Sequence, residues 1–180
     1  MLDPTRDAPV KQLRTRIRLA CSVSKKQGDK SGRMTKYWRQ YGALPIRIVE
    51  GGLEVLLVTS RSSRRWIIPK GWPEKRLAPR VVVAMEAFEE AGIIGRAHPQ
   101  RFGTYRYRKR LKGGKQITCE VEVYLFDVAW QFSDWPERGE RELAWFSIEA
   151  AAALVEEAGL GKLLLSLLAQ TIIVEHTAAE

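Results

Sequence analysis

Three glutamates stand close together in a segment that is otherwise apolar. Glu86, Glu89 and Glu90 follow a run of small and aliphatic residues. In a helix, side chains three and four positions apart share one face, so these carboxylates would leave a single turn. Like charges at this spacing repel one another and weaken the helix. A hard divalent cation such as Mg²⁺ removes that repulsion because it takes oxygen ligands, so the spacing predicts a metal site.

The alternative is a solvated acidic helix face, which is the usual meaning of clustered glutamates. Three features of the sequence argue against it. A Pro69-Lys70-Gly71 turn precedes the segment, and Gly92 ends the helix directly after the acidic turn. The remaining helix positions are too apolar for a free surface element: Val81, Val82, Val83 and Met85.

The segment that begins at Gly71 resembles the Nudix box, the signature of hydrolases that cut a nucleoside diphosphate linked to another moiety. The box has a glycine, a first glutamate, an Arg-Glu pair, an aliphatic residue, a Glu-Glu pair, a glycine and an aliphatic residue, in that order. Matching positions are Gly71, Glu86, Glu89, Glu90, Gly92 and Ile93. The first glutamate falls on Leu77 and the arginine on Met85, while Ala87 stands where a larger aliphatic residue is usual.

The turn before the box, from Trp66 to Gly71, resembles that of diadenosine and diphosphoinositol polyphosphate hydrolases. The resemblance extends over residues 43–168 and implies an α/β fold, the Nudix α/β/α sandwich with a mixed central sheet. It also implies Mg²⁺ or Mn²⁺ as the cofactor. Glu86, Glu89 and Glu90 would be the catalytic carboxylates. Glu86 and Glu90 would be direct metal ligands, Glu89 a third ligand or the base, and the Lys70 carbonyl a further ligand.

Several Nudix enzymes take one more carboxylate from outside the box. Four glutamates are candidates for it here, and no spacing rule selects among them: Glu120, Glu122, Glu140 and Glu142.

The two departures from the box remove a charged pair. In the family, the box arginine and the first glutamate help to orient the catalytic carboxylates. We expect Leu77 and Met85 to pack together, partly buried, where that pair usually lies. Replacing a buried ion pair by apolar residues is often neutral for stability. An orienting hydrogen bond to Glu86 or Glu89 would be lost, and such bonds tune metal sites.

Two basic segments flank the box. Residues 61–80 hold seven Lys/Arg against one acid, and residues 101–115 hold seven with no acid. Arginine's planar fork suits phosphate oxygens, so as a set these residues favour a substrate with many phosphates. Taken singly, each one is better explained as an exposed loop residue. The predicted substrate-binding residues are Arg61, Arg64, Arg65, Lys70, Arg106 and Arg108, with Trp72 as a possible stacking group.

Apolar and alternating patterns predict the elements that carry these residues. Strands are expected at residues 43–49, 53–59, 66–69, 102–110, 116–128 and 143–146. Helices are expected at residues 80–91, 147–157 and 162–174, with Gly159 and Gly161 between the last two.

Charge is unevenly distributed along the 180 residues. Residues 1–40 carry 11 Lys/Arg and 3 Asp, which is most of the net charge of +9. This part is poor in large apolar residues, and we predict a basic, mobile N-terminal arm there, followed by one domain at residues 41–176. As an interpretation of the arm, a solubilising tail is favoured over RNA binding.

Composition and motifs indicate the expected cellular compartment. Hydrophobic content is 45%, and no apolar run is long enough for a transmembrane helix or a signal core. The two cysteines lie far apart in the sequence, so a reduced cytoplasmic protein with no membrane partner is expected. The sequence leaves the oligomeric state open.

The leading function is metal-dependent hydrolysis of a phosphoanhydride bond in a polyphosphorylated small molecule. Dinucleoside polyphosphates, diphosphoinositol polyphosphates and nucleotide diphosphates are the candidate substrates. Two alternatives stay open, an RNA 5′-end pyrophosphohydrolase and a catalytically weak module that binds polyphosphate or nucleotide.

Overall fold

The computed structural model describes residues 37–50 and 52–176. The predicted arm, residues 1–40, lies almost wholly outside these residues and stays a prediction. The first strand begins at Trp38, three residues before the predicted start of the domain. In chain order the elements are β1 (Trp38–Val49), β2 (Gly52–Thr59), β3 (Trp66–Ile67), β4 (Lys70–Gly71), α2 (Pro79–Ala91), β5 (Ile93–Ala97), β6 (Gly103–Arg110), β7 (Gln116–Gln131), β8 (Leu143–Ser147), α3 (Ile148–Leu154) and α4 (Ala158–His176).

The strands form a mixed sheet in which neighbours along the main path are β3, β2, β1, β7 and β5. The central pair, β1 and β7, is parallel over a long register from Trp38 opposite Cys119 to Ile46 opposite Asp127. The remaining pairs are antiparallel, with β4 on β1, β6 on β7 and β8 on β2. The predicted mixed sheet is confirmed.

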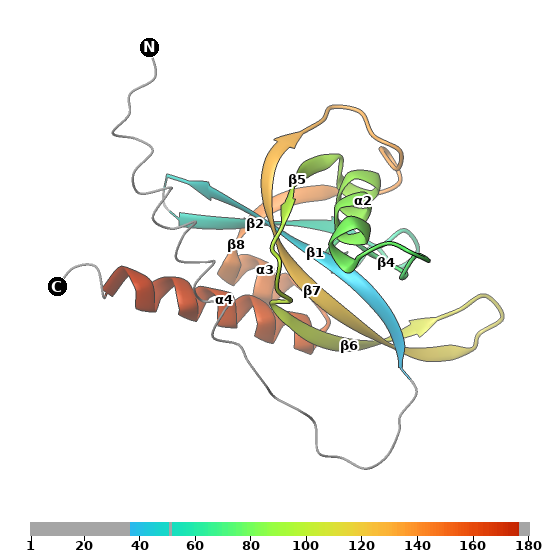
Figure 1. Cartoon of the computed structure of the whole chain (residues 1–180). Helices are drawn as coiled ribbons and strands as arrows, with labels where there is room; N and C mark the ends of the chain where they lie inside the picture. The colour runs from blue at the N-terminus through green and yellow to red at the C-terminus, as the bar shows by residue number, and fades with distance from the viewer. Residues whose placement is uncertain (1–36, 51, 177–180) are drawn as a thin grey trace.

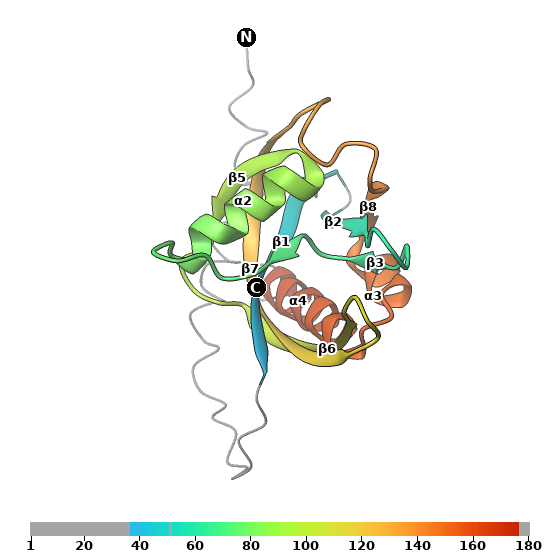
Figure 2. The same cartoon turned by 90° about the vertical axis from the view of Figure 1, so that its right-hand side faces the viewer.

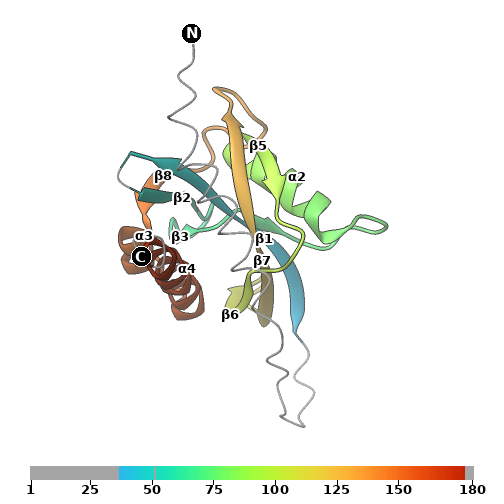
Figure 3. The ribbon, with the colours of Figure 1, turned by 60° about the vertical axis from the view of Figure 1, so that its left-hand side comes forward.

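Helices cover both faces of the sheet, as Figures 1 and 3 show: α2 lies on one side, and α3 with α4 on the other. Under α2, one apolar core joins helix residues such as Val83 to sheet residues such as Leu56 and Phe126. Under α3 and α4, a second core joins Leu164 to Leu125 and other residues. The predicted α/β/α sandwich is therefore confirmed.

Helix α2 carries the three glutamates, and local signals set both of its ends. Pro79 stands at the start of the helix, where its missing N–H costs nothing. Gly92 ends the helix in the left-handed conformation, with φ of 64°, and its N–H donates to the Phe88 carbonyl over 2.9 Å. Buried positions Val82, Val83, Ala87 and Ala91 fix which face meets the sheet.

Two strands were not expected. β4 contains only Lys70 and Gly71, and β5 follows α2 directly in a segment where no strand was predicted. β7 also runs three residues further than predicted, because its end pairs with β5 across a bulge between Ile94 and Gly95. These pairings join segments distant in sequence, so short apolar runs alone did not reveal them.

The predicted break between the last two helices is misplaced, because α4 begins at Ala158 and includes both glycines. A Cβ on Gly159 would lie 2.8 Å from the Cβ of Tyr105, so this glycine permits close packing of α4 on β6. Within the described part of the chain, no helix is long and apolar enough to cross a membrane.

Gly92→Ala should lower the free energy of unfolding by at least about 1–2 kcal/mol, because alanine is strained at a left-handed position. Its Cβ would also lie 2.6 Å from the Trp135 ring. Urea unfolding measures the loss. Gly113→Ala is the matched control, since Gly113 has φ of 85° and nothing within 4 Å of its Cβ. Equal losses in the two variants would contradict a role for the Trp135 contact.

Candidate active site

The carboxylate of Glu86 lies directly against the main chain at Gly71. A Cβ on Gly71 would be 1.5 Å from Glu86 Oε1 and 2.1 Å from the carboxyl carbon. Any other residue would therefore displace this side chain from its place. β4 holds Gly71 there by pairing it with Tyr41 of β1, so the turn before the helix and the helix itself form one unit.

Glu90 is the most buried of the three glutamates, with 9% of its side chain exposed. One carboxylate oxygen accepts the backbone N–H of Lys70 over 3.2 Å, and the other accepts a short hydrogen bond from Arg141. Burial raises the pKa of Glu90, while the positive charges of Arg141 and Lys70 oppose that rise. The protein therefore holds Glu90 by hydrogen bonds to both of its carboxylate oxygens.

Burial raises the pKa of Glu86 from 4.5 to about 7, and the negative charges of Glu90, Glu89 and Glu137 add to the effect. The positive charge of Arg141 lowers the pKa of Glu86, but by less than burial and the neighbouring carboxylates raise it. Glu89, by contrast, is exposed at the end of the helix. The three predicted glutamates therefore act on one another electrostatically but differ in burial.

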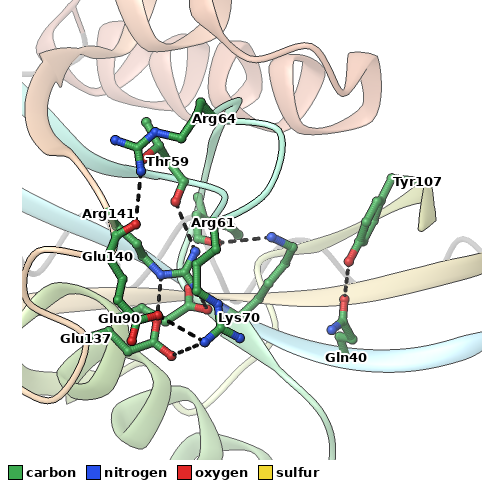
Figure 4. Close-up of polar contacts among 11 residues, drawn as sticks. Gln40, Thr59, Arg61, Arg64, Lys70, Glu90, Tyr107, Glu137, Glu140 and Arg141 are labelled. Atoms are coloured by element: carbon green, nitrogen blue, oxygen red, sulfur yellow. Dashed lines mark hydrogen bonds and ion pairs between the residues drawn. The ribbon is translucent and has the colours of Figure 1, made fainter. Parts of the chain in front are cut away.

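Arg141 joins the helix to the loop between β7 and β8, and it is absent from the predicted site. Only 5% of its side chain is exposed. Besides Glu90, it donates from Nε to Glu137 over 2.7 Å and from Nη1 to the Thr59 carbonyl over 3.0 Å (Figure 4). Glu137 also accepts Arg61 over 3.3 Å. In the sequence, a glutamate and an arginine four positions apart in a polar loop resemble a surface pair, so no local signal marks them as buried.

Lys70 lies between the acidic cluster and a second polar group. Burial lowers the pKa of its ammonium from 10.5 to about 8, although Glu90 and Glu157 oppose the change. Its Nζ is 5.5 Å from the centre of the Tyr107 ring. The Tyr107 hydroxyl in turn donates to Gln40 over 2.6 Å (Figure 4). The structure thus brings predicted residue Lys70 beside the box glutamates.

The arginines of the loop after β2 are already paired with glutamates. Arg61 contacts Glu140 over 3.2 Å as well as Glu137. Arg64 pairs with Glu142 and donates to the Glu140 carbonyl over 2.9 Å. Arg65 reaches Glu156 and Glu157 over 3.5 and 3.4 Å. As substrate ligands these predicted residues would first have to leave internal partners.

Arg106 and Arg108 lie on the other side of β6 from Lys70. Lys70 faces the Tyr107 ring, and successive side chains of a strand point to opposite faces. Arg106 pairs with Glu120 over 2.8 Å, and its guanidinium is 3.8 Å from the centre of the Tyr37 ring. Arg108 is exposed. The structure therefore does not bring these two arginines together with Lys70.

The candidates for the extra carboxylate are engaged elsewhere. Glu120 and Glu122 lie on β7, where Glu122 pairs with Arg39 and Arg101, and Glu140 and Glu142 pair with Arg61 and Arg64. Together with burial, the negative charge of Glu137 raises the pKa of both Glu86 and Glu90. Glu137 is itself paired with Arg61 and Arg141, so its carboxylate too reaches the box glutamates only through its charge.

Leu77, which we expected to be partly buried against Met85, keeps most of its surface away from water. Its side chain is 37% exposed, in a turn where its N–H donates to the Glu74 carbonyl over 3.3 Å. Met85 is half-buried on α2. The expected packing of Leu77 on Met85 stays a prediction.

A model of the NUDIX domain matches residues 38–167, which is most of the chain. The chain belongs to the Nudix family. Nudix proteins are generally pyrophosphohydrolases and typically use a divalent metal. The resemblance predicted from the box is thereby confirmed.

Similar proteins include Nudix hydrolase 12, mitochondrial, of Arabidopsis thaliana, which is 30% identical over 109 residues, or 57% of this chain and 52% of that protein. Diphosphoinositol polyphosphate phosphohydrolase 3-beta of Bos taurus is 31% identical over 106 residues, or 57% and 60%. The chain thus spans little more than half the length of these relatives. A crystal structure of C. elegans Ap4A hydrolase shares the fold, with a TM-score of 0.57 and 21% identity over 74% of this chain and 98% of that one.

The donor set of this Nudix site fits a divalent cation. Carboxylate oxygens are the ligands that Mg²⁺ and Mn²⁺ prefer, and the repulsion that remains at Glu86 is what a cation would relieve. The space left by the missing Cβ of Gly71 keeps that carboxylate against the main chain. Among the described residues, no three acidic, His or Cys side chains already converge as a metal cluster. The carboxylates would therefore have to rearrange around an ion.

In the metal-free protein, Glu86→Gln should raise Tm relative to wild type, and the gain should grow as pH rises. A carboxyl whose folded pKa is raised from 4.5 to about 7 favours the folded state when protonated, so stability falls as pH increases through that window. Thermal unfolding with a chelator, at several pH values, measures the difference. Glu74→Gln, at an exposed position, is the control. A gain that does not change with pH would contradict the raised pKa.

Proposed function

We propose that this chain is a divalent-metal-dependent hydrolase that cleaves a phosphoanhydride bond in a polyphosphorylated small molecule. The observation that carries the proposal is the acidic cluster on α2. Glu86 lies against Gly71, and its pKa is raised by burial and by Glu90, Glu89 and Glu137. A protein keeps such repulsion at a site where a cation or a proton is handled.

Glu86, Glu89 and Glu90, with the Lys70 carbonyl, would hold Mg²⁺ or Mn²⁺. When bound, the metal supplies charge neutralisation at phosphoryl oxygens and an acidified water. Glu90 is fixed by Arg141 and the Lys70 N–H, which suits a ligand. Glu86 lies against Gly71 among the negative charges of Glu90, Glu89 and Glu137, which suits a second metal ligand.

The cations beside the box support a phosphate-rich substrate. Lys70 is next to Glu90, and Lys109 is close enough to lower the pKa of Lys70. Lys109 is therefore a better candidate phosphate ligand than Arg61, Arg64 or Arg65, whose glutamate partners compete for them. Similarity to a diphosphoinositol polyphosphate phosphohydrolase supports the same substrate class.

Two exposed tryptophans favour a substrate that also carries a nucleobase. Trp72 directly follows Gly71, and its ring is 6.2 Å from that of Trp38. They are 39% and 49% exposed, and Lys109 Nζ is 4.8 Å from the centre of the Trp72 ring. Aromatic rings beside cations bind bases by stacking and the adjoining phosphates by charge. An inositol polyphosphate has no aromatic face, so we place dinucleoside polyphosphates first.

Hydrolysis of diadenosine tetraphosphate should require Mg²⁺ or Mn²⁺, and Glu86→Gln or Glu90→Gln should reduce kcat/KM by about 100-fold or more, the scale on which a catalytic group acts. Glu149→Gln, exposed at the start of α3, should leave it unchanged. Product release followed by chromatography is the measurement. Substrate binding without metal-dependent cleavage would favour the binding module over the enzyme.

Trp72→Ala should raise KM for diadenosine tetraphosphate by roughly tenfold, since a stacked base is worth about 1–3 kcal/mol. KM for a diphosphoinositol polyphosphate should change little. Trp130→Ala is the matched control, because Trp130 is 63% exposed near the other end of β7. Equal changes for both substrates would indicate a structural role for Trp72 and leave the base unrecognised.

A further inference from the structure

We propose that Arg141 and Glu137, on the loop between β7 and β8, replace the charged pair that the box lacks and act as positioning residues for Glu90. The inference rests on the proposed function, because it assigns these residues a role at the same metal site. Leu77 and Met85, which stand where the box has its first glutamate and its arginine, carry no charge.

The contacts of Arg141 suit a residue that holds the Glu90 carboxylate in position. All three of its guanidinium nitrogens donate, to Glu90, to Glu137 and to the Thr59 carbonyl. With 5% of its side chain exposed, it is shielded from water. A planar fork held at three points leaves the partner carboxylate little freedom, and lysine cannot reproduce that geometry.

The loop that carries Arg141 is attached to the last turn of α2. Figure 2 shows the chain leaving β7 and passing the end of α2 before it reaches β8. Phe132 N–H donates to the Gly92 carbonyl over 2.8 Å, and Glu137 N–H to the Glu89 carbonyl over 3.2 Å. The Trp135 ring lies over Gly92. Arg141 is therefore placed relative to the helix by backbone contacts as well as by its own charge.

Arg141 could instead stand in the place of the metal and exclude it. The geometry argues against such a plug. Arg141 bonds one oxygen of Glu90 and the Lys70 N–H bonds the other, but a carboxylate has about four lone-pair directions, so acceptor capacity remains. In the part of the chain that the structure describes, no hydrogen bond or ion pair joins Arg141 to Glu86 or Glu89. These two carboxylates remain for a cation.

Mn²⁺ affinity, measured by electron paramagnetic resonance on the full chain, tests the proposal. Arg141→Met should weaken Mn²⁺ binding by about 10- to 100-fold, the usual cost of losing a group that orients a metal ligand. The Mn²⁺ affinity of Arg141→Lys should lie between those of wild type and Arg141→Met. Arg138→Met is the matched control, because Arg138 lies in the same loop, is exposed and pairs with Asp134. Circular dichroism checks that each variant is folded.

A variant that restores the two charged residues of the box gives the decisive test. In the Arg141→Met background, Leu77→Glu with Met85→Arg should recover at least part of the lost Mn²⁺ affinity, because a charged pair then returns from the box side. An Arg141→Met variant that is folded and binds Mn²⁺ as wild type does would overturn the proposal, and so would a failure of the restored box to recover any affinity. Tighter Mn²⁺ binding in Arg141→Met would show that the guanidinium is a plug.

The readout separates this proposal from the proposed function. If wild type binds Mn²⁺ at the site but hydrolyses no phosphoanhydride, the enzymatic function fails while the positioning role is still measured. If wild type binds no Mn²⁺, both proposals are overturned.

Discussion

The site depends on a buried carboxyl group that the protein holds by hydrogen bonds to both of its oxygens. Glu90 is held by a guanidinium on one oxygen and a backbone N–H on the other. A buried charge without partners would cost far more than a single domain can offset. β4 places the Lys70 N–H beside Glu90, and the loop before β8 places Arg141 there. Beside Glu90, Glu86 keeps a net repulsion from its neighbouring carboxylates, which the charge of Arg141 offsets only in part.

Much of the fold could be predicted from the sequence because its signals are local. Helix periodicity, Pro79 and Gly92 defined α2 closely, and alternation defined β6 and most of β7. β4 and β5 could not be predicted, since strands of two and five residues are strands only because distant partners pair with them. The same holds for α4, whose early glycines suggested a break and instead allow contact with β6.

The same distinction holds in the candidate site: residues with a local signal could be predicted, and residues placed by distant contacts could not. The three glutamates were predicted from their spacing, and Gly71 from the resemblance to the box. Arg141 was not, since it reaches Glu90 across 51 positions of sequence. The basic segments illustrate the reverse error: counting charges in a window cannot tell whether they are already neutralised. Arg61, Arg64 and Arg65 pair with glutamates that come much later in the sequence. The dense basic loop is therefore part of an ion-pair network.

The attachment of the β7–β8 loop to α2 has a consequence for how such a sequence can diverge. With the orienting charge on the loop, box positions 77 and 85 are released to drift, while the loop's length and its Glu137–Arg141 spacing become fixed. Close relatives should therefore vary where the box is normally invariant and tolerate no insertion where a surface loop is normally permissive. Judging such chains by the box alone would class a site whose orienting charge has moved to the loop as a decayed one.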